Sequence, residues 1–207
     1  MTRIRRFGWW VVVGLATALP AMSQQGAGAP PASAPQAKPA PAPETTIAGT
    51  IDREVGIYER LVVGAAEAMP EEKFNFTPAS LNLPGSAFSD VRTFASLVKH
   101  TAAANYAFWS GVTGEKMPEN INGLNGPDEL KTKAQIVQFL KDSFAVGHRA
   151  AQSLTSANLL EQVPIRDSKA PKLFLTTFAI VHCGDDYGQM VEYLRMNGIV
   201  PPASRGR

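Results

Sequence analysis

Apolar residues recur every three or four positions in four long stretches of the chain, which is the spacing of one buried face of an α-helix. The first stretch covers residues 50–69, has charged residues between its apolar positions, and stops at Pro70. The second opens with a candidate cap at Ser89–Asp90 and keeps the same spacing as far as Gly114. We therefore expect two amphipathic helices in this half of the chain.

The third and fourth stretches follow a polar linker rich in asparagine and glycine at residues 115–126. Pro127 and the two acids after it are typical of a first helical turn, so the third helix is expected to begin there. A short connection leads to Pro171, after which the fourth stretch keeps the helical spacing as far as Gly198. No segment alternates between apolar and polar residues as a half-buried strand does. The sequence therefore predicts an all-α fold, a four-helix bundle.

The first 44 residues lack this pattern and are expected to lie outside the bundle. Residues 1–23 combine a basic start with an apolar core too short for a comfortable membrane span, and Ala21 and Ser23 offer the small residues of a cleavage site. We interpret them as a cleaved signal peptide, which would leave no stable membrane span and an exported protein, periplasmic or secreted. Residues 24–44 are mostly Ala, Pro, Gly, Ser and Gln and are expected to form a disordered linker.

The remaining segment, residues 45–204, is long enough for one domain with a real core. Removal of the signal peptide takes away three arginines, so 17 basic and 18 acidic side chains remain and the formal net charge changes from +2 to −1. That balance gives no support for binding to nucleic acids or anionic membranes. Cys183 is the only cysteine, which excludes an internal disulfide and leaves packing, a metal or self-association to stabilise an exported domain.

The strongest candidate for chemistry lies on the fourth helix, where His182 and Asp186 are one turn apart on a face otherwise filled by apolar groups. Burial of an unpaired carboxylate is unfavourable, and a metal or a hydrogen-bonded partner would offset that cost. His100 follows apolar residues on the second helix, and two histidines with one carboxylate can hold a divalent metal with coordination positions left open. In the simpler alternative, His182 and Asp186 form an ordinary helical side-chain pair and His100 is a hydrogen-bonded core histidine.

Other reactive residue types are better explained by structure. His148 lies near the apolar stripe of the third helix without a partner at helical spacing, so we expect it to be structural and only a reserve ligand. Cys183 has a histidine neighbour, but adjacent helical residues point about 100° apart, so a buried inert cysteine is expected rather than a Cys–His dyad. For the same reason only one of Asp185 and Asp186 can face the site. The aromatic residues at positions 106–109 could line a pocket, but such residues more often close a core.

Two runs of the sequence resemble the DinB-like superfamily, Leu97–Tyr106 in the second helix and, more specifically, His182–Pro202 in the fourth. The resemblance implies a four-helix bundle, often dimeric, whose members commonly hold a divalent metal, often zinc or nickel. The ligands are one histidine on the second helix and two histidines four residues apart on the fourth. His100 and His182 match the first two positions, and Asp186 stands where the third histidine would be. A carboxylate can ligate zinc, nickel or iron(II), so Asp186 either keeps the site with an altered metal preference or marks its loss.

The resemblance also implies an activity. Characterised relatives include thiol-dependent transferases, in which a metal lowers the pKa of a bound low-molecular-weight thiol and presents its thiolate to an electrophile. Metal-activated water for hydrolysis is the second enzymatic hypothesis, and a noncatalytic binding or structural bundle that has lost the metal site is the alternative. The expected partners are a small-molecule thiol or electrophile and a second copy of the chain in a homodimer, but no nucleic acid.

Overall fold

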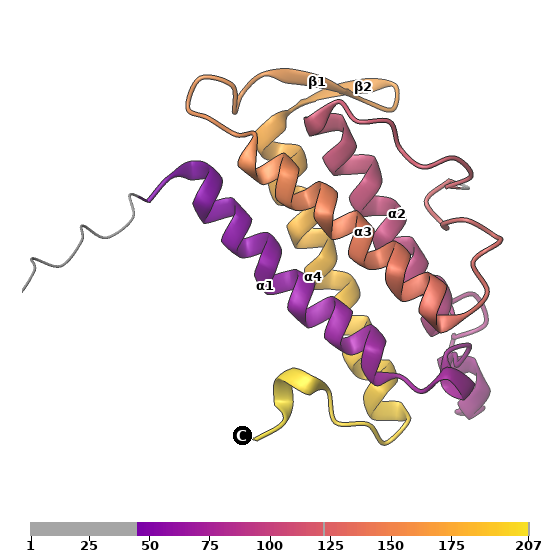
Figure 1. Cartoon of the computed structure of the whole chain (residues 1–207). Coiled ribbons are helices and arrows are strands. Elements are labelled where there is room, and N and C mark those ends of the chain that lie inside the picture. Colours follow the sequence, from indigo (N-terminus) through magenta and orange to yellow (C-terminus); the bar gives the residue numbers. More distant parts are fainter. Residues whose placement is uncertain (1–44, 122, 207) are drawn as a thin grey trace, which may run out of the picture. The chain divides into compact units, whose positions relative to one another are not determined.

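The computed structural model describes residues 45–121 and 123–206, so the expected signal peptide and linker at residues 1–44 lie outside the described residues. Four α-helices make up most of the described chain (Figure 1): α1 Ile47–Ala68, α2 Phe94–Thr113, α3 Lys133–Gln152 and α4 Lys172–Met196. The predicted all-α four-helix bundle is confirmed. Within the described ranges, no helix combines the length and the apolar character that a membrane crossing needs.

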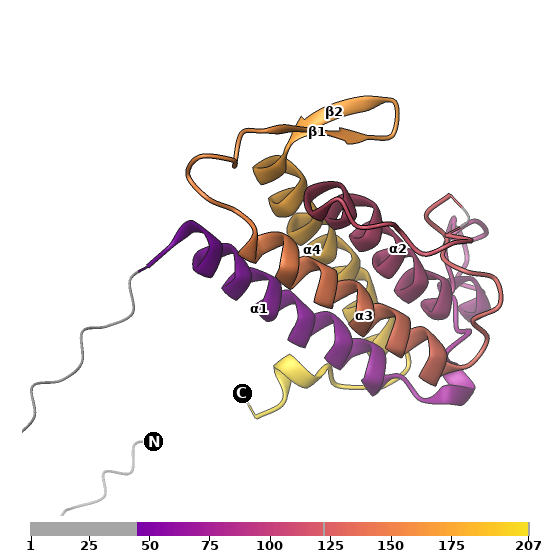
Figure 2. The ribbon, with the colours of Figure 1, turned by 45° about the horizontal axis from the view of Figure 1, so that its top comes forward.

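Each helix of the bundle has two close neighbours. α2 packs against α3 and α4, and α1 packs against the same two helices, whereas α3 and α4 barely touch. The first residues of α2 and α3 both lie beside the chain that leaves α1, because Phe94 N donates to Phe76 O (2.9 Å) and Lys133 N donates to Glu71 Oε1 (3.1 Å). α2 and α3 therefore run in the same direction (Figure 2), and the chain between them, described at residues 114–121 and 123–132, returns along the bundle as a crossover loop.

Threonine hydroxyls set where the first three helices begin: Thr46, Thr93 and Thr132 accept hydrogen bonds from the backbone N–H groups of Gly49, Ser96 and Gln135. The Gln135 side chain also accepts from the Thr132 N–H, which completes a capping box. α2 consequently begins at Phe94 and not at Ser89–Asp90, and α3 begins at Lys133 and not at Pro127. Both predicted starts were wrong, because the hydroxyl that satisfies a free amide decides where a helix begins.

A β-hairpin joins α3 to α4, although the sequence predicted no strand. β1 (Gln162–Ile165) pairs antiparallel with β2 (Ser168–Pro171). Each strand has four residues and buries only one of them, Val163 or Ala170, which is too short to show an alternating pattern. Gly111 allows β1 to approach α2, because a Cβ there would lie 3.3 Å from Pro164 O.

The core is filled by side chains from all four helices, with Trp109 among its largest members. The Trp109 ring lies 5.7 Å from that of Phe144, centroid to centroid. It also lies against Gly147, where an added Cβ would come within 2.6 Å of the ring. Trp109 therefore closes the core, which is the commoner role of such aromatic residues. Its truncation to alanine would lower the free energy of unfolding by roughly 3–5 kcal/mol.

Candidate metal centre

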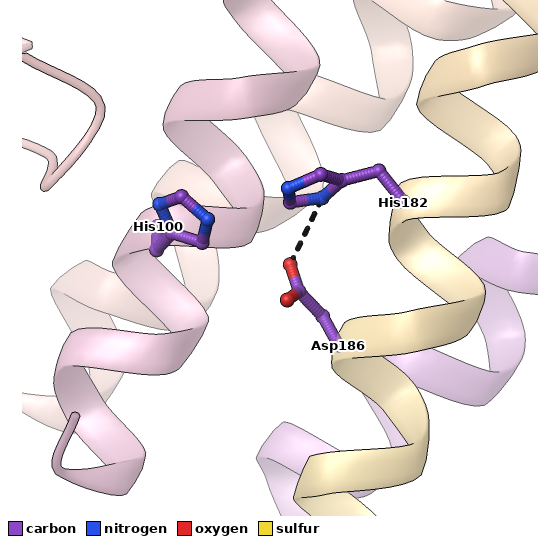
Figure 3. Close-up of side chains that lie close together, drawn as sticks. All are labelled: His100, His182 and Asp186. Carbon is purple, nitrogen blue, oxygen red and sulfur yellow. Dashed lines mark ion pairs between the residues drawn. The ribbon is translucent and has the colours of Figure 1, made fainter. Parts of the chain in front are cut away.

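α4 presents His182 and Asp186 from consecutive turns toward α2 (Figure 3). His182 Nδ1 lies 3.1 Å from Asp186 Oδ2, and the two side chains are 21% and 3% exposed. Asp186 is therefore a buried carboxylate whose charge needs a partner. Asp185, one residue earlier, is exposed and accepts a hydrogen bond from Gln189 instead, so only one of the two acids faces the site, as predicted.

α2 places His100 opposite this pair, with its ring centroid 5.1 Å from that of His182. His100 Nδ1 lies 2.7 Å from the carbonyl oxygen of Leu124 in the crossover loop. Because a carbonyl can only accept, Nδ1 carries the proton, and Nε2 of the neutral ring is left as a free electron-pair donor. One ligand atom from each of the three side chains lies within 4.8 Å of the other two. The structure thus brings all three predicted residues together.

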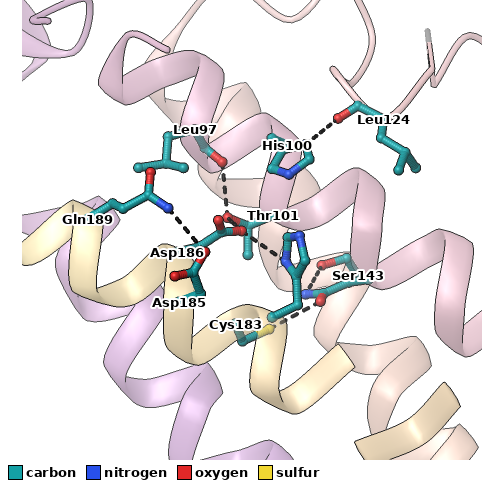
Figure 4. Close-up of polar contacts among 11 residues, drawn as sticks. Leu97, His100, Thr101, Leu124, Ser143, Cys183, Asp185, Asp186 and Gln189 are labelled. Carbon is teal, nitrogen blue, oxygen red and sulfur yellow. Dashed lines mark hydrogen bonds and ion pairs between the residues drawn. The ribbon is translucent and has the colours of Figure 1, made fainter. Parts of the chain in front are cut away.

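Thr101 supports the buried carboxylate from α2 (Figure 4). Its hydroxyl oxygen lies 2.8 Å from Asp186 Oδ2 and 3.0 Å from the carbonyl oxygen of Leu97. The hydroxyl has one proton and can donate to only one of these acceptors at a time. Donation to Asp186 fixes the orientation of the carboxylate, as the outer hydrogen bonds of metal ligands commonly do.

The two histidines have different electrostatic surroundings. Burial lowers the pKa of His100 more than its hydrogen bond to Leu124 raises it, so the ring is neutral at neutral pH. The neighbouring Asp186 carboxylate raises the pKa of His182 more than burial lowers it. The carboxylate thus favours a positive charge in the space between the two side chains. A metal cation there would compete with the proton for His182.

The surroundings of His182 Nδ1 fit a shared cation. Among the described residues this buried atom has no hydrogen-bond partner, although it lies 3.1 Å from Asp186 Oδ2. Two ligand atoms that each lie about 2.1 Å from one ion are about 3 to 3.4 Å apart in tetrahedral or octahedral geometry. The contact therefore has the spacing of two ligands of one metal, and the donor set of two imidazoles and one carboxylate suits zinc, nickel or iron(II).

Aromatic rings border the three candidate ligands. The ring of Phe108 lies 6.2 Å from that of His182 and 5.2 Å from that of Phe178, which stacks on Phe174 at 5.3 Å. Phe174 and Phe178 are 50% and 40% exposed, so this part of the apolar face of α4 is not covered by the bundle. His100 and His182 themselves are only half-buried.

Comparison of the sequence with protein-family models and with curated proteins finds no match. Comparison of the structure does find similar proteins. A DinB-like protein from Bacillus cereus matches with a TM-score of 0.59 at 16% identity, over 76% of this chain and 96% of its own. The chain has the DinB-like fold. A second DinB-like protein, from Bacillus subtilis, matches with a TM-score of 0.50 at 17% identity, over 72% of this chain and 92% of its own.

The predicted resemblance to the DinB-like superfamily is confirmed by these matches at the level of the fold. At identities of 16% and 17%, the likeness concerns the fold alone.

His148 and Cys183 lie outside the candidate ligand set of this DinB-like bundle. His148 on α3 contacts two carboxylates of α1, with Nδ1 2.6 Å from Asp52 Oδ1 and Nε2 3.1 Å from Glu59 Oε2. Cys183 is fully buried, its Sγ lies 3.1 Å from Asn105 Oδ1, and burial raises the pKa of its thiol. The structure therefore places His148 in a contact between α1 and α3, and it keeps Cys183 as a buried thiol with low reactivity.

Sequence reasoning missed two residues that support the centre, Thr101 and Leu124. Thr101 follows His100 directly on α2, so its side chain points about 100° away from that of His100. In the structure this direction brings the hydroxyl to Asp186 of α4. Leu124 acts through its backbone carbonyl. Any residue type offers such an oxygen, so the sequence carries no signal for it.

Proposed function

We propose that this chain is a divalent-metal-binding DinB-like protein whose ion is held by His100, His182 and Asp186. The observation that carries the proposal is that three ligand atoms from α2 and α4 lie within 4.8 Å of one another. The buried His182 Nδ1, which has no hydrogen-bond partner and lies 3.1 Å from the carboxylate, supports it. Zinc, nickel and iron(II) are the metals that this donor set suits.

The proposed reaction class is a metal-dependent transfer, in which a small-molecule thiol attacks an electrophile, or a hydrolysis. A bound ion would supply Lewis acidity that lowers the pKa of a coordinated thiol or water. The chain's own groups would position the metal ligands and shape the surroundings of the ion. Thr101 and the Leu124 carbonyl would orient ligands, and the ring of Phe108 would border the centre.

One observation favours the alternative, a noncatalytic bundle without a metal. Asp186 already lies 2.8 Å from the Thr101 hydroxyl and 3.1 Å from His182, whose raised pKa favours its protonated form. An ion pair with protonated His182 would satisfy the carboxylate without a metal. In that case changes at the three positions would alter stability and leave metal content unchanged.

Metal content separates the two functions. Purified protein would be loaded in turn with zinc, nickel and anaerobic iron(II), desalted, and analysed by inductively coupled plasma mass spectrometry, with affinity measured by calorimetry. We expect about one equivalent of at least one metal in the wild type. Loss of a ligand should weaken binding more than the 10- to 100-fold typical of losing an outer hydrogen bond. His182→Ala and Asp186→Ala should both show this, whereas Asp186→His should retain an ion.

His148→Ala is the matched control, because it removes a half-buried histidine beside two carboxylates but leaves the centre untouched. It should bind metal as the wild type does. Failure of the wild type to bind any of the three metals would contradict the proposal and favour the noncatalytic bundle. Equal metal content in wild type and His182→Ala would also contradict it.

Export of the chain and formation of a homodimer stay predictions from the sequence. Cell fractionation with and without residues 1–23 would test export, and analytical ultracentrifugation would test the homodimer. A small-molecule thiol or an electrophile remains the predicted partner class.

A further inference from the structure

A cleft of about 800 Å³ opens beside the candidate ligands, toward the end of the bundle that carries the hairpin. Its lining includes Ala107, Ser110 and Gly111 of α2, Leu124 of the crossover loop, and Pro164 and Arg166 of the hairpin. This volume is in the range of pockets that bind small organic molecules.

The cleft is connected to the candidate metal centre through two of its lining residues. Leu124 lines the cleft and accepts the hydrogen bond from His100 Nδ1 (2.7 Å). Ala107 lies two turns after His100 on nearly the same face of α2, because residues seven apart in a helix differ by only about 20° in direction. A molecule in the cleft would therefore lie along the face of α2 that leads to His100.

Small residues keep the cleft open along α2. Ala107, Gly111 and Gly114 lie on one face of the helix, and none of them has a side chain long enough to fill the space above it. Met117 and Ile165 add apolar surface at the sides. The cleft therefore offers mainly apolar contacts to a bound molecule.

Two polar groups of the cleft have no partner among the described residues. The Ser110 hydroxyl is buried and makes no hydrogen bond within that part of the chain. The exposed Arg166, at the hairpin turn, makes no hydrogen bond or ion pair with any part of the chain that the structure describes. The acid in the lining, Glu115, is held by both Nε (2.7 Å) and Nη2 (2.6 Å) of Arg149. The charged side chain of the cleft lining that is left without an ion-pair partner among the described residues is therefore the positive Arg166.

We propose that this cleft binds an apolar small molecule that carries a carboxylate or another anionic group. The apolar body lies against Ala107 and Gly111, the anionic group pairs with Arg166, and the Ser110 hydroxyl hydrogen-bonds to a polar atom of the molecule. Binding in the cleft needs no metal. The role of this molecule as the electrophile of the reaction rests on the proposed function.

The experiment compares two probes of the same shape, 4-phenylbutyrate and 4-phenylbutan-1-ol, by ligand-observed NMR titration. Wild-type protein should bind the anion about 3- to 10-fold more tightly than the alcohol, which is the size of effect expected for one partly exposed ion pair. Arg166→Gln should reduce this preference to less than twofold. Lys169→Gln is the matched control, because it removes an exposed positive charge from the same hairpin outside the cleft lining and should keep the preference.

Ala107→Leu tests the location, because the larger side chain would occupy the cleft. It should weaken both probes at least tenfold with an unchanged circular dichroism spectrum. Binding of neither probe by the wild type, retention of the preference in Arg166→Gln, or wild-type affinity in well-folded Ala107→Leu would each overturn the proposal.

The same titrations on metal-loaded protein, on protein treated with EDTA, and on His182→Ala separate this proposal from the metal site. Cleft binding that persists in all three samples supports the cleft whether or not the wild type holds a metal. Loss of probe binding in the EDTA-treated sample and in His182→Ala would overturn the proposal that the cleft binds its ligand without a metal ion.

Discussion

Asp186 is the side chain on which the proposed metal centre depends. It is a carboxylate with 3% of its side chain exposed, in contact with Thr101 at 2.8 Å and with His182 at 3.1 Å. A third neutral imidazole at this position would bring no charge. The carboxylate brings a negative charge that would attract a divalent cation into a partly buried space, and in the proposed centre it would change which metals are preferred.

Thr101 offers a test of the outer hydrogen bond. Thr101→Val keeps the shape of the side chain but removes the donor to Asp186, so we expect metal affinity to fall by about 10- to 100-fold. Calorimetric titration with zinc and nickel would measure the change. Thr101→Ser keeps the hydroxyl and should stay close to the wild type. Equal affinities in all three proteins would show that Thr101 does not orient the carboxylate.

Much of the candidate centre could be predicted from the sequence. Helical spacing places His182 and Asp186 on consecutive turns of one face, and His100 follows apolar residues on a helix about 80 residues earlier, where the resemblance also expects a ligand. The exposure of Phe178 and the contact of the Leu124 carbonyl with His100 could not be predicted. Both depend on which distant segments pack against a helix, and no local sequence pattern encodes that packing.

Among the elements, the helix bodies were predictable, and so were the ends marked by Pro70, Gly114, Pro171 and Gly198, but the starts of α2 and α3 were not. Periodic apolar residues mark a buried face over several turns, whereas the start of α3 depends on the hydroxyl of one residue, Thr132. The hairpin was missed because its strands are too short for a pattern. The two glycines inside α4, Gly184 and Gly188, have different surroundings. Gly184 lies against Tyr58, with a Cβ 3.1 Å from its ring, and Gly188 faces open space.

Two glycine substitutions should change the free energy of unfolding in opposite directions. Gly188→Ala meets nothing within 4 Å and should raise the free energy of unfolding by about 0.5–1 kcal/mol, because alanine favours the helix. Gly147→Ala would place a Cβ 2.6 Å from the buried Trp109 ring and should lower the free energy of unfolding by roughly 1–3 kcal/mol. Urea denaturation would measure both. A loss of stability in Gly188→Ala would show that its surroundings are more crowded than described.

The contact of His148 with Asp52 and Glu59 should make the pairing of α1 and α3 depend on pH. Burial lowers the pKa of His148, but the hydrogen bonds to both carboxylates outweigh it, and the net pKa is raised above its usual 6.5. The stabilisation is therefore fully present below about pH 6.5 and is lost as pH rises through the higher folded-state pKa.

The difference in unfolding free energy between wild type and His148→Gln measures this contact. It should reach roughly 1 kcal/mol at pH 6 and shrink toward zero by pH 9, since the groups are partly exposed. Denaturant titrations at both pH values would give the two differences. A difference that grows with pH would have the wrong sign for a protonated histidine between two acids.

For the whole molecule, the decisive feature is the crossover loop, which is described at residues 114–121 and 123–132. α2 and α3 run in the same direction, so the chain has to return along the bundle, and it does so over the outer face of α2 (Figure 1). Lys99 Nζ donates to Pro127 O (2.9 Å), and Gly126 lies so close to Lys99 that a Cβ would come within 2.9 Å of its side chain. The sequence predicted a linker here but not its path, which depends on these distant contacts. The same loop orients His100 and forms one wall of the cleft.

Anomalous X-ray diffraction from crystals soaked in zinc, recorded at the zinc absorption edge, would show directly whether one cation is shared by α2 and α4. We expect a single strong peak about 2.0–2.2 Å from one atom each of His100, His182 and Asp186. A peak at His148, or no peak between the three side chains after soaking, would contradict a metal centre at this place in the bundle.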